Sequence, residues 1–314
     1  MKAVTIETEG GLSLREHADP APAGGEVLVR IRAAGVNNAD LLQVAGKYPA
    51  PADSPQDIPG LEFAGEVVAL GASAHRFSKG DRVMGILGGG GQAELISIHE
   101  GILMAIPDEL TWEQAGGFPE AFVTAHDALF TQGRLRPGDR VLINGAAGGV
   151  GVAALQIAAA AGAEVVASVR NTDNWEAVRV LGASKIVSPA DAEENGPYDV
   201  ILELVGATNF EANLRSLKQD GRIVIIGTGS GTEARLDFRL LMSKRATVRA
   251  STLRARPLEE KAIATRAVAR EVLPLVAAGK VLSLIAATYP LSDAQAAYDA
   301  FRNGGKVGKI VLLA

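Results

Sequence analysis

The stretch that decides the fold is VLINGAAGGVG, residues 141–151. It leaves an apolar run typical of a buried strand and enters an apolar run that continues to Ala161. Glycines here let the backbone turn tightly and approach a pyrophosphate, and the helix N-terminus beyond offers free N–H groups to that anion. Gly148 and Gly151 match the second and third glycines of G-x-G-x-x-G, whereas Ala146 replaces the first. We predict a nucleotide-binding turn; a purely structural strand-to-helix turn is the alternative.

The segments that follow this stretch alternate between strand and helix patterns. Such alternation implies parallel βαβ units with helices on both faces of the sheet, an α/β, doubly wound fold. The expected strands are 140–144, 164–169, 199–204 and 222–227, and the expected helices are 150–161, 174–181, 210–217 and about 258–278.

The first third of the chain has a different character, with short β-like runs separated by glycine and proline. This pattern suggests a compact β-rich domain. Thr111 and Gln114 are spaced as an N-cap and its capping-box partner, and Ser292 is the expected N-cap of a late helix. The last run, 309–313, is expected to be a strand that rejoins the β-rich domain, which makes that domain discontinuous.

Composition excludes several classes of function. Apolar residues make up 47% of the 314 residues and the net charge is -5, so a large core is available and nucleic acid is not an expected partner. Without cysteine, the chain has no disulfides, thiolate nucleophile or thiolate metal ligands. The first residues lack a signal-peptide pattern, and the longest apolar stretch is too short to span a bilayer. We therefore expect a cytoplasmic protein that does not enter the membrane.

The cofactor is predicted from the exit of the second strand. An acidic residue there would bind the ribose 2′-hydroxyl of NAD. Arg170 stands there instead, and a guanidinium can pair with the 2′-phosphate of NADPH. Ser168 and Asn171 are weaker candidates for the same phosphate, and a solvated surface arginine is the alternative for Arg170.

Several segments in collinear order resemble a known family. They are 34–42, 46–49, 59–65, 146–151 and 304–313. Together they resemble the zinc-independent quinone oxidoreductase branch of the medium-chain dehydrogenase/reductase superfamily, which includes the zeta-crystallin and stress-inducible types. The resemblance implies a GroES-like β-barrel domain, residues 1–118 and 284–314, and a Rossmann domain, residues 119–283. It also implies a homodimer that forms through the edge of the nucleotide-binding sheet.

The resemblance also implies the site residues. Tyr48 is the substrate-facing tyrosine or a packed turn aromatic, Asn37 orients a substrate carbonyl, and Asp40 is catalytic or holds the local turn. The other members of the predicted set bind the cofactor: Thr124, Ala147, Gly148, Gly149, Val150, Gly227, Thr228, Leu253 and Lys309. Arginines between residues 245 and 270 are expected to form a solvated face. No metal is expected, because Leu61 stands where zinc-dependent relatives have a ligand and leucine cannot coordinate zinc.

A chain without that Lewis acid should favour acceptors that are already electrophilic. We expect hydride transfer from NADPH to a quinone or activated enone. An enoyl-thioester reductase and a non-enzymatic, crystallin-like nucleotide-binding protein are the alternatives. Asn174 stands where the family often has a lysine, which weakens the expectation of NADPH.

Overall fold

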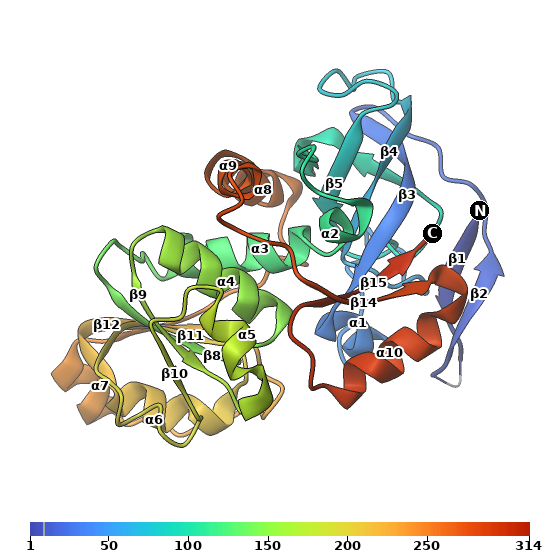
Figure 1. Ribbon diagram of the computed structural model, residues 1–314. Helices are drawn as coiled ribbons and strands as arrows, with labels where there is room; N and C mark the ends of the chain where they lie inside the picture. Colours follow the sequence, from blue (N-terminus) through green and yellow to red (C-terminus); the bar gives the residue numbers. More distant parts are fainter. Residues whose placement is uncertain (9) are drawn as a thin grey trace.

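The nucleotide turn follows the central strand of a six-stranded parallel sheet, in a computed structural model that describes residues 1–8 and 10–314 (Figure 1). The strands lie in the order β10-β9-β8-β11-β12-β13. Their bounds are β8 (Arg140–Asn144), β9 (Glu164–Ser168), β10 (Lys185–Val187), β11 (Tyr198–Glu203), β12 (Leu217–Ile225) and β13 (Thr247–Ala250). The predicted α/β fold with a doubly wound sheet is confirmed.

Helices cover both faces of this sheet, so side chains that point to either side of a strand are buried. Val141 and Ile143 of β8 belong to the core beneath one set of helices, whereas Leu142 packs in a separate core with Leu214. The first set comprises α3 (Pro119–His126), α4 (Gly149–Ala160), α5 (Trp175–Arg179), α8 (Leu258–Glu271) and α9 (Leu273–Ala277), and the second comprises α6 (Phe210–Arg215) and α7 (Phe238–Lys244).

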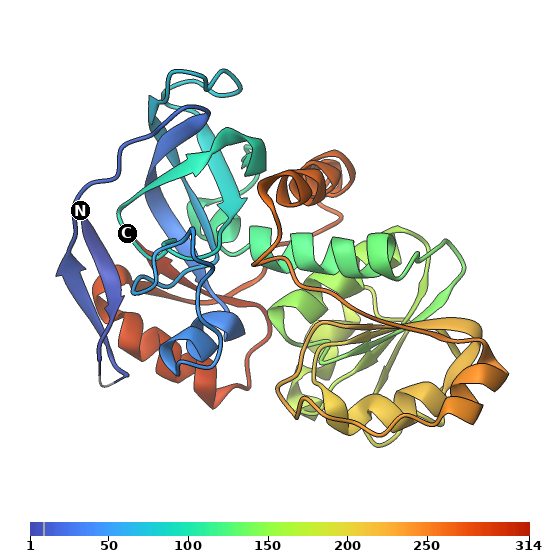
Figure 2. The same cartoon turned by 180° about the vertical axis from the view of Figure 1, so that it is seen from behind.

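A second sheet forms the other lobe, which is coloured blue, cyan and red in Figures 1 and 2. Its order is β14-β15-β3-β4-β5-β7, with β6 paired to β3. Its strands are β3 (Glu26–Val36), β4 (Glu62–Leu70), β5 (Arg82–Ile86), β6 (Leu95–His99), β7 (Leu103–Ala105), β14 (Ile285–Pro290) and β15 (Lys309–Leu313). Because β15 runs antiparallel to β3, the end of the chain rejoins its first third, as predicted.

Smaller elements complete this lobe. A two-stranded sheet joins β1 (Lys2–Ile6) and β2 (Leu12–Glu16), and the helices are α1 (Asn38–Val44), α2 (Trp112–Gly116) and α10 (Ala294–Asn303). The capping box at Thr111 is confirmed, because its hydroxyl accepts from the N–H of Gln114. No helix in the described part of the chain is long and apolar enough to cross a membrane.

Two helix predictions are wrong in detail. The helix expected over about 258–278 is two helices, because Pro274 lacks the N–H that a continuous helix would need and starts a new one instead. The N-cap position of the late helix is Asp293 rather than Ser292, since residues 291–293 first form a 3-10 turn, and the Asp293 side chain makes no capping hydrogen bond. The sequence pattern also did not predict two short edge strands, β10 and β13.

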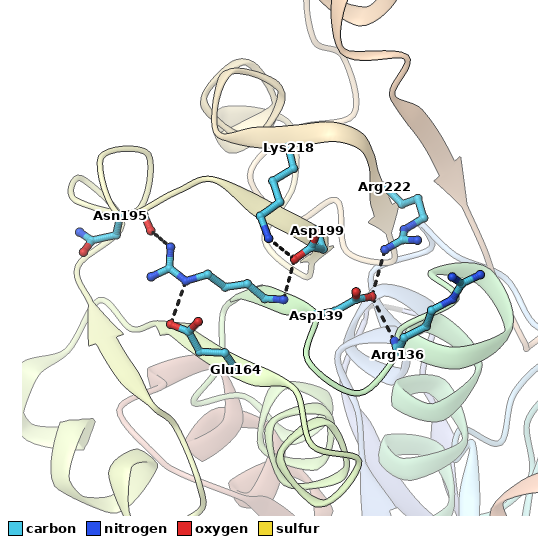
Figure 3. A network of polar contacts seen from close by, with 8 residues as sticks. Arg136, Asp139, Glu164, Asn195, Asp199, Lys218 and Arg222 are labelled. Carbon is cyan, nitrogen blue, oxygen red and sulfur yellow. Dashed lines mark hydrogen bonds and ion pairs between the residues drawn. The ribbon is translucent and has the colours of Figure 1, made fainter.

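A network of charged groups closes the amino-terminal edge of the parallel sheet, opposite the nucleotide turn (Figure 3). Asp199 accepts from the backbone N–H of Arg140 at 2.8 Å and from Nζ of Lys218 at 2.6 Å. Asp139 accepts from Arg222 at 3.1 Å. These contacts join the starts of β8, β11 and β12, so the network stabilises the sheet away from the ligand-binding edge.

Replacing Asp199 with alanine should lower stability without affecting nucleotide binding. The change leaves the N–H of Arg140 and the ammonium of Lys218 without their acceptor, at a cost of about 1–2 kcal/mol in the free energy of unfolding. Urea denaturation measures this cost. Glu176→Ala is the control, because Glu176 makes only an exposed pair with Arg179. Equal stability of the two variants would contradict the structural role of Asp199.

Candidate functional site

The turn after β8 is built around backbone contacts that exclude side chains. Gly145 adopts φ +79°, and a Cβ on Gly151 would lie 2.4 Å from the carbonyl oxygen of Gly145. Gly148 is the N-cap of α4 and, among the described residues, no side chain caps this helix. The first N–H groups of α4 therefore remain available to an anion, as the sequence pattern predicts for a pyrophosphate site.

A cavity of about 620 Å³ begins at this turn and is lined by residues from both lobes. Its walls include the ends of β8, β11 and β12, the start of α1 and the segment before β15. The structure brings most of the predicted site residues to this cavity: Asn37, Tyr48, Thr124, Gly148, Gly149, Val150, Gly227, Thr228, Leu253 and Lys309. The volume lies within the range typical of cofactor and substrate sites.

Three predicted residues follow β9, outside the cavity lining. Ser168 is buried at the strand end, where its carbonyl oxygen accepts from the N–H of Ala146. The side-chain carbonyl oxygen of Asn171 accepts from the backbone N–H of Asp173 and so caps the 3-10 turn Thr172–Asn174. Arg170 is exposed two residues beyond the strand and makes no hydrogen bond or ion pair with any described residue. Because β8 and β9 are paired up to Asn144 and Ser168, this arginine stands beside the nucleotide turn.

Two further predicted residues also lie outside the lining. Ala147 is partly buried within the turn itself. Asp40 is fully buried, and its oxygens accept from the N–H groups of Asn37 at 2.8 Å and Gly60 at 3.0 Å. Burial raises the pKa of Asp40 to about 7, although both N–H donors act to lower it. In this position Asp40 holds the turn at the start of α1 and does not face the cavity.

A buried ion pair lies beneath the cavity. Nζ of Lys309 is 2.6 Å from Oε1 of Glu62, and Glu62 is fully buried. The other oxygen of Glu62 accepts from the backbone N–H of Glu120 at 2.9 Å. Asn37 completes the group: its amide donates to Glu62 at 2.9 Å, and its carbonyl oxygen accepts from Lys309. Asn37 thus keeps a single amide hydrogen that could reach a ligand.

Arg254 joins the two lobes at the mouth of the cavity. Its guanidinium donates to the carbonyl oxygens of Gly88 at 2.8 Å and Tyr48 at 2.9 Å, and to the side chain of Gln43. The same group lies 4.9 Å from the centre of the Tyr48 ring, and the Tyr48 hydroxyl is 3.2 Å from Oγ1 of Thr252. These contacts fix the tyrosine against the segment that carries Leu253.

The expected solvated arginine face is therefore wrong at two positions. Arg254 is only 4% exposed, and Arg256 pairs with buried Asp127 through both guanidinium nitrogens. Planar guanidinium groups can satisfy several acceptors at once, so the sequence spacing alone does not separate buried arginines from solvated ones.

Glu120 and Lys306 are among the cavity-lining residues that the sequence did not predict. Glu120 precedes Thr124 by one helical turn on α3, and within the described residues its carboxyl makes no hydrogen bond or ion pair. Burial, followed by the nearby charge of Glu62, raises the pKa of Glu120 to about 8. Lys306 lies 3.7 Å from the centre of the Phe301 ring and donates to the Phe301 carbonyl oxygen. Helical spacing from Thr124 could have indicated Glu120.

Two family models match the two lobes. The alcohol dehydrogenase GroES-like domain matches residues 23–108, and the zinc-binding dehydrogenase domain matches residues 149–270. The quinone oxidoreductase of Lama guanicoe is 30% identical over 100% of this chain and 97% of its own length. The chain belongs to the medium-chain dehydrogenase/reductase superfamily.

Other relatives in this superfamily have different names. The acryloyl-coenzyme A reductase of Metallosphaera sedula is 31% identical over 99% of each chain. Polyketide synthase GfsB of Streptomyces halstedii is 36% identical over 92% of this chain, which spans 5% of that synthase. The solved Escherichia coli quinone oxidoreductase has the same fold, with a TM-score of 0.88 and 24% identity over 100% of both chains.

The chain is thus an oxidoreductase of the superfamily with an NAD(P)-binding fold. The uncapped helix, the glycine turn and the cavity fit a dinucleotide. No group of three or more metal-binding side chains is found among residues 1–8 and 10–314.

Replacing Arg254 with lysine should loosen the tyrosine loop. A lysine ammonium cannot reach Gly88, Tyr48 and Gln43 with the planar geometry of a guanidinium. We expect unfolding free energy to fall by about 1–3 kcal/mol and amide hydrogen exchange to speed up across residues 43–51. Arg266→Lys, on the exposed face of α8, is the control. Unchanged amide hydrogen exchange across residues 43–51 would show that Arg254 does not hold this loop in place.

Proposed function

We propose that this protein is an NADPH-dependent reductase that transfers hydride to quinones without a metal. The observation that carries the proposal is the shared cavity: the nucleotide turn and Tyr48 face the same space. A nicotinamide held beside Thr228 and Leu253 would therefore lie on the same side as an acceptor beside Tyr48. The match to quinone oxidoreductases over nearly the full length of both chains supports the choice of acceptor.

The cofactor-binding roles follow the shape of the cavity. The N-terminus of α4, with Gly148, Gly149 and Val150, would hold the pyrophosphate. Thr124, Gly227, Thr228 and Leu253 would surround the nicotinamide, which supplies the hydride when the cofactor is bound. The aliphatic stem of Lys309 lies against Gly149, where a Cβ would be 2.8 Å from its Cδ. Lys309 would thus support the turn from below.

The preference for NADPH rests on Arg170, with Ser168 and Asn171 close in sequence. Arg170 is the cation at the strand exit that has no protein partner among the described residues, so it can approach a 2′-phosphate without giving up another contact. The solved Escherichia coli relative is a complex with NADPH, which supports the same preference.

On the acceptor side, Tyr48 and Asn37 are the proposed binding groups. The Tyr48 hydroxyl can donate to a quinone oxygen while it remains near Thr252. Asn37 contributes its remaining amide hydrogen. The superfamily's zinc ligands are not needed for this chemistry, because a quinone is electrophilic without a Lewis acid.

A second candidate is reduction of an activated double bond, in an enone or enoyl thioester. It is favoured by the acryloyl-coenzyme A reductase, which is as similar to this chain as the quinone oxidoreductases are. A non-enzymatic, crystallin-like role in nucleotide binding is a third candidate.

We also propose the domain division and the assembly state. The boundary at 118 and 119 coincides with the start of α3, and the boundary at 283 and 284 precedes β14. Strand β13 is exposed along its length and pairs with β12 on one side, which supports a homodimer formed by continuing the sheet. A cytoplasmic location stays a prediction of the sequence. Light scattering on the purified protein measures the mass of the assembly.

The acceptor assay tests the proposed reaction. NADPH oxidation is followed at fixed protein concentration with an ortho-quinone, an enone and a short enoyl-coenzyme A thioester. Rapid oxidation of NADPH with the quinone supports the proposal. The three rates can be compared directly, because the cofactor and the protein are the same in each assay. Turnover with the enone or the thioester alone would replace it with the second candidate, and tight NADPH binding without turnover would favour the third.

Replacing Arg170 with alanine should remove the preference for NADPH. Loss of one charge-assisted contact to the 2′-phosphate is expected to weaken NADPH binding by about 10- to 100-fold and leave NADH binding unchanged. Titration of intrinsic fluorescence with each nucleotide measures both affinities. Arg179→Ala is the control, since Arg179 pairs with Glu176 on the surface of α5. Equal loss of affinity for NADPH and NADH would show that Arg170 does not recognise the 2′-phosphate.

A further inference from the structure

Glu120 is the one carboxyl side chain lining the cavity that has no partner among the described residues. The other acidic residue in the lining, Asp127, is held by Arg256 and Ser251. The backbone N–H of Glu120 is fixed by Glu62, which anchors the start of α3, while its side chain is left to face the cavity. Glu120 is partly exposed, so a ligand or water in the cavity can reach its free carboxyl.

Glu120 lines the part of the cavity where we expect the nicotinamide and the acceptor to lie side by side. Thr124, one turn later on α3, is the predicted nicotinamide contact, and Leu61, Asn37 and Tyr48 line the same cavity. An acceptor between the nicotinamide and Tyr48 would therefore lie beside α3 at this turn.

We propose that Glu120 is a catalytic proton donor, which rests on the reductase function proposed above. Reduction of a quinone or enone requires a hydride and a proton. The hydride brings two electrons and one hydrogen to the acceptor. The O–H bond of Glu120 breaks, an O–H bond forms on the acceptor oxygen, and the carboxylate left behind takes a proton back from solvent.

The charges around Glu120 decide whether it holds that proton. It is faced by Glu62 of β4 and Asp40 of α1, which raise its pKa, and by Lys309 of β15 and Arg254 after β13, which lower it. Lys261 of α8 lies on the same side and has its own pKa lowered by burial. Burial is the largest effect, and the pKa of Glu120 rises to about 8, so most of the carboxyl is protonated at pH 7. A free tyrosine, with a pKa of about 10, is a weaker acid than this carboxyl.

The first test is kinetic and compares Glu120→Gln with the parent protein. The amide keeps the shape of the side chain and cannot supply an acidic proton. We expect kcat/KM for the acceptor to fall about 100-fold at pH 7. In the parent protein kcat/KM should fall as pH rises above about 8, and the variant should lose this dependence. Tyr48→Phe should retain it, and Glu109→Gln, in an exposed turn, is the control for the substitution itself.

The second test does not depend on activity or on the nucleotide. An unfolded glutamate ionises near its ordinary pKa, whereas folded Glu120 keeps its proton up to about pH 8. The unfolding free energy of the parent protein therefore falls as pH rises from about 5 to about 8. Above about pH 8, Glu120 makes no further contribution to this fall. Glutamine has no such dependence. The Tm of the Glu120→Gln variant should consequently rise relative to the parent between about pH 5 and pH 8.

The two tests separate failure of this inference from failure of the proposed function. If the parent protein reduces an acceptor and Glu120→Gln has the same rate and pH profile, Glu120 is not the donor. A Tm difference that does not change with pH would mean that Glu120 is ionised in the folded state, which also overturns the inference. If the parent protein reduces none of the acceptors, the proposed function fails and the donor role fails with it, while the Tm measurement still reports the protonation of the carboxyl.

Discussion

The ion pair between Glu62 and Lys309 is the contact on which the arrangement of the site depends. A buried ion pair is stable only when its remaining hydrogen-bonding capacity is satisfied. Here the second oxygen of Glu62 accepts from the N–H of Glu120, and Asn37 bonds to both charged groups. One pair thus joins β4, β15, α1 and α3. Gly35 makes room for it, because a Cβ there would lie 2.1 Å from Glu62.

This pair explains why residues distant in sequence share one cavity. Residues 37, 62, 120 and 309 come from the beginning, the middle and the end of the chain, and they meet because β15 returns to pair with β3. The same pair changes the chemistry available to Asn37, whose carbonyl oxygen and one amide hydrogen are already used. Polar groups that still have free capacity at the cavity surface are fewer than the sequence suggests. A ligand in this cavity therefore meets a small set of free polar groups.

Local sequence rules could predict the fold to the extent that each element depends on its own residues. The strand, glycine turn and apolar helix of 141–151 follow from local pattern, and the final strand 309–313 has its predicted bounds. The break in the long helix could have been predicted, because Pro274 lacks the N–H that a continuous helix needs. The short edge strands β10 and β13 could not, because three or four residues carry too weak a period. For the site, motif and resemblance indicated the residues that line the cavity. They could not show that Asp40 turns inward, or that Glu120 has no partner, because both depend on tertiary contacts.

The segment 251–256 shows how the two lobes are made to act together. Arg256 binds Asp127 at the end of α3, on the nucleotide side, while Arg254, two residues earlier, binds Tyr48 and Gly88 on the other lobe. Leu253 directly precedes Arg254 and lines the cavity. A displacement of either lobe must therefore break charge-assisted hydrogen bonds at one of the two arginines. The same few residues hold both the proposed nicotinamide contact and the tyrosine loop. In the proposed reaction, the distance between hydride donor and acceptor would therefore depend on this short, doubly anchored segment more than on the long connections between the lobes.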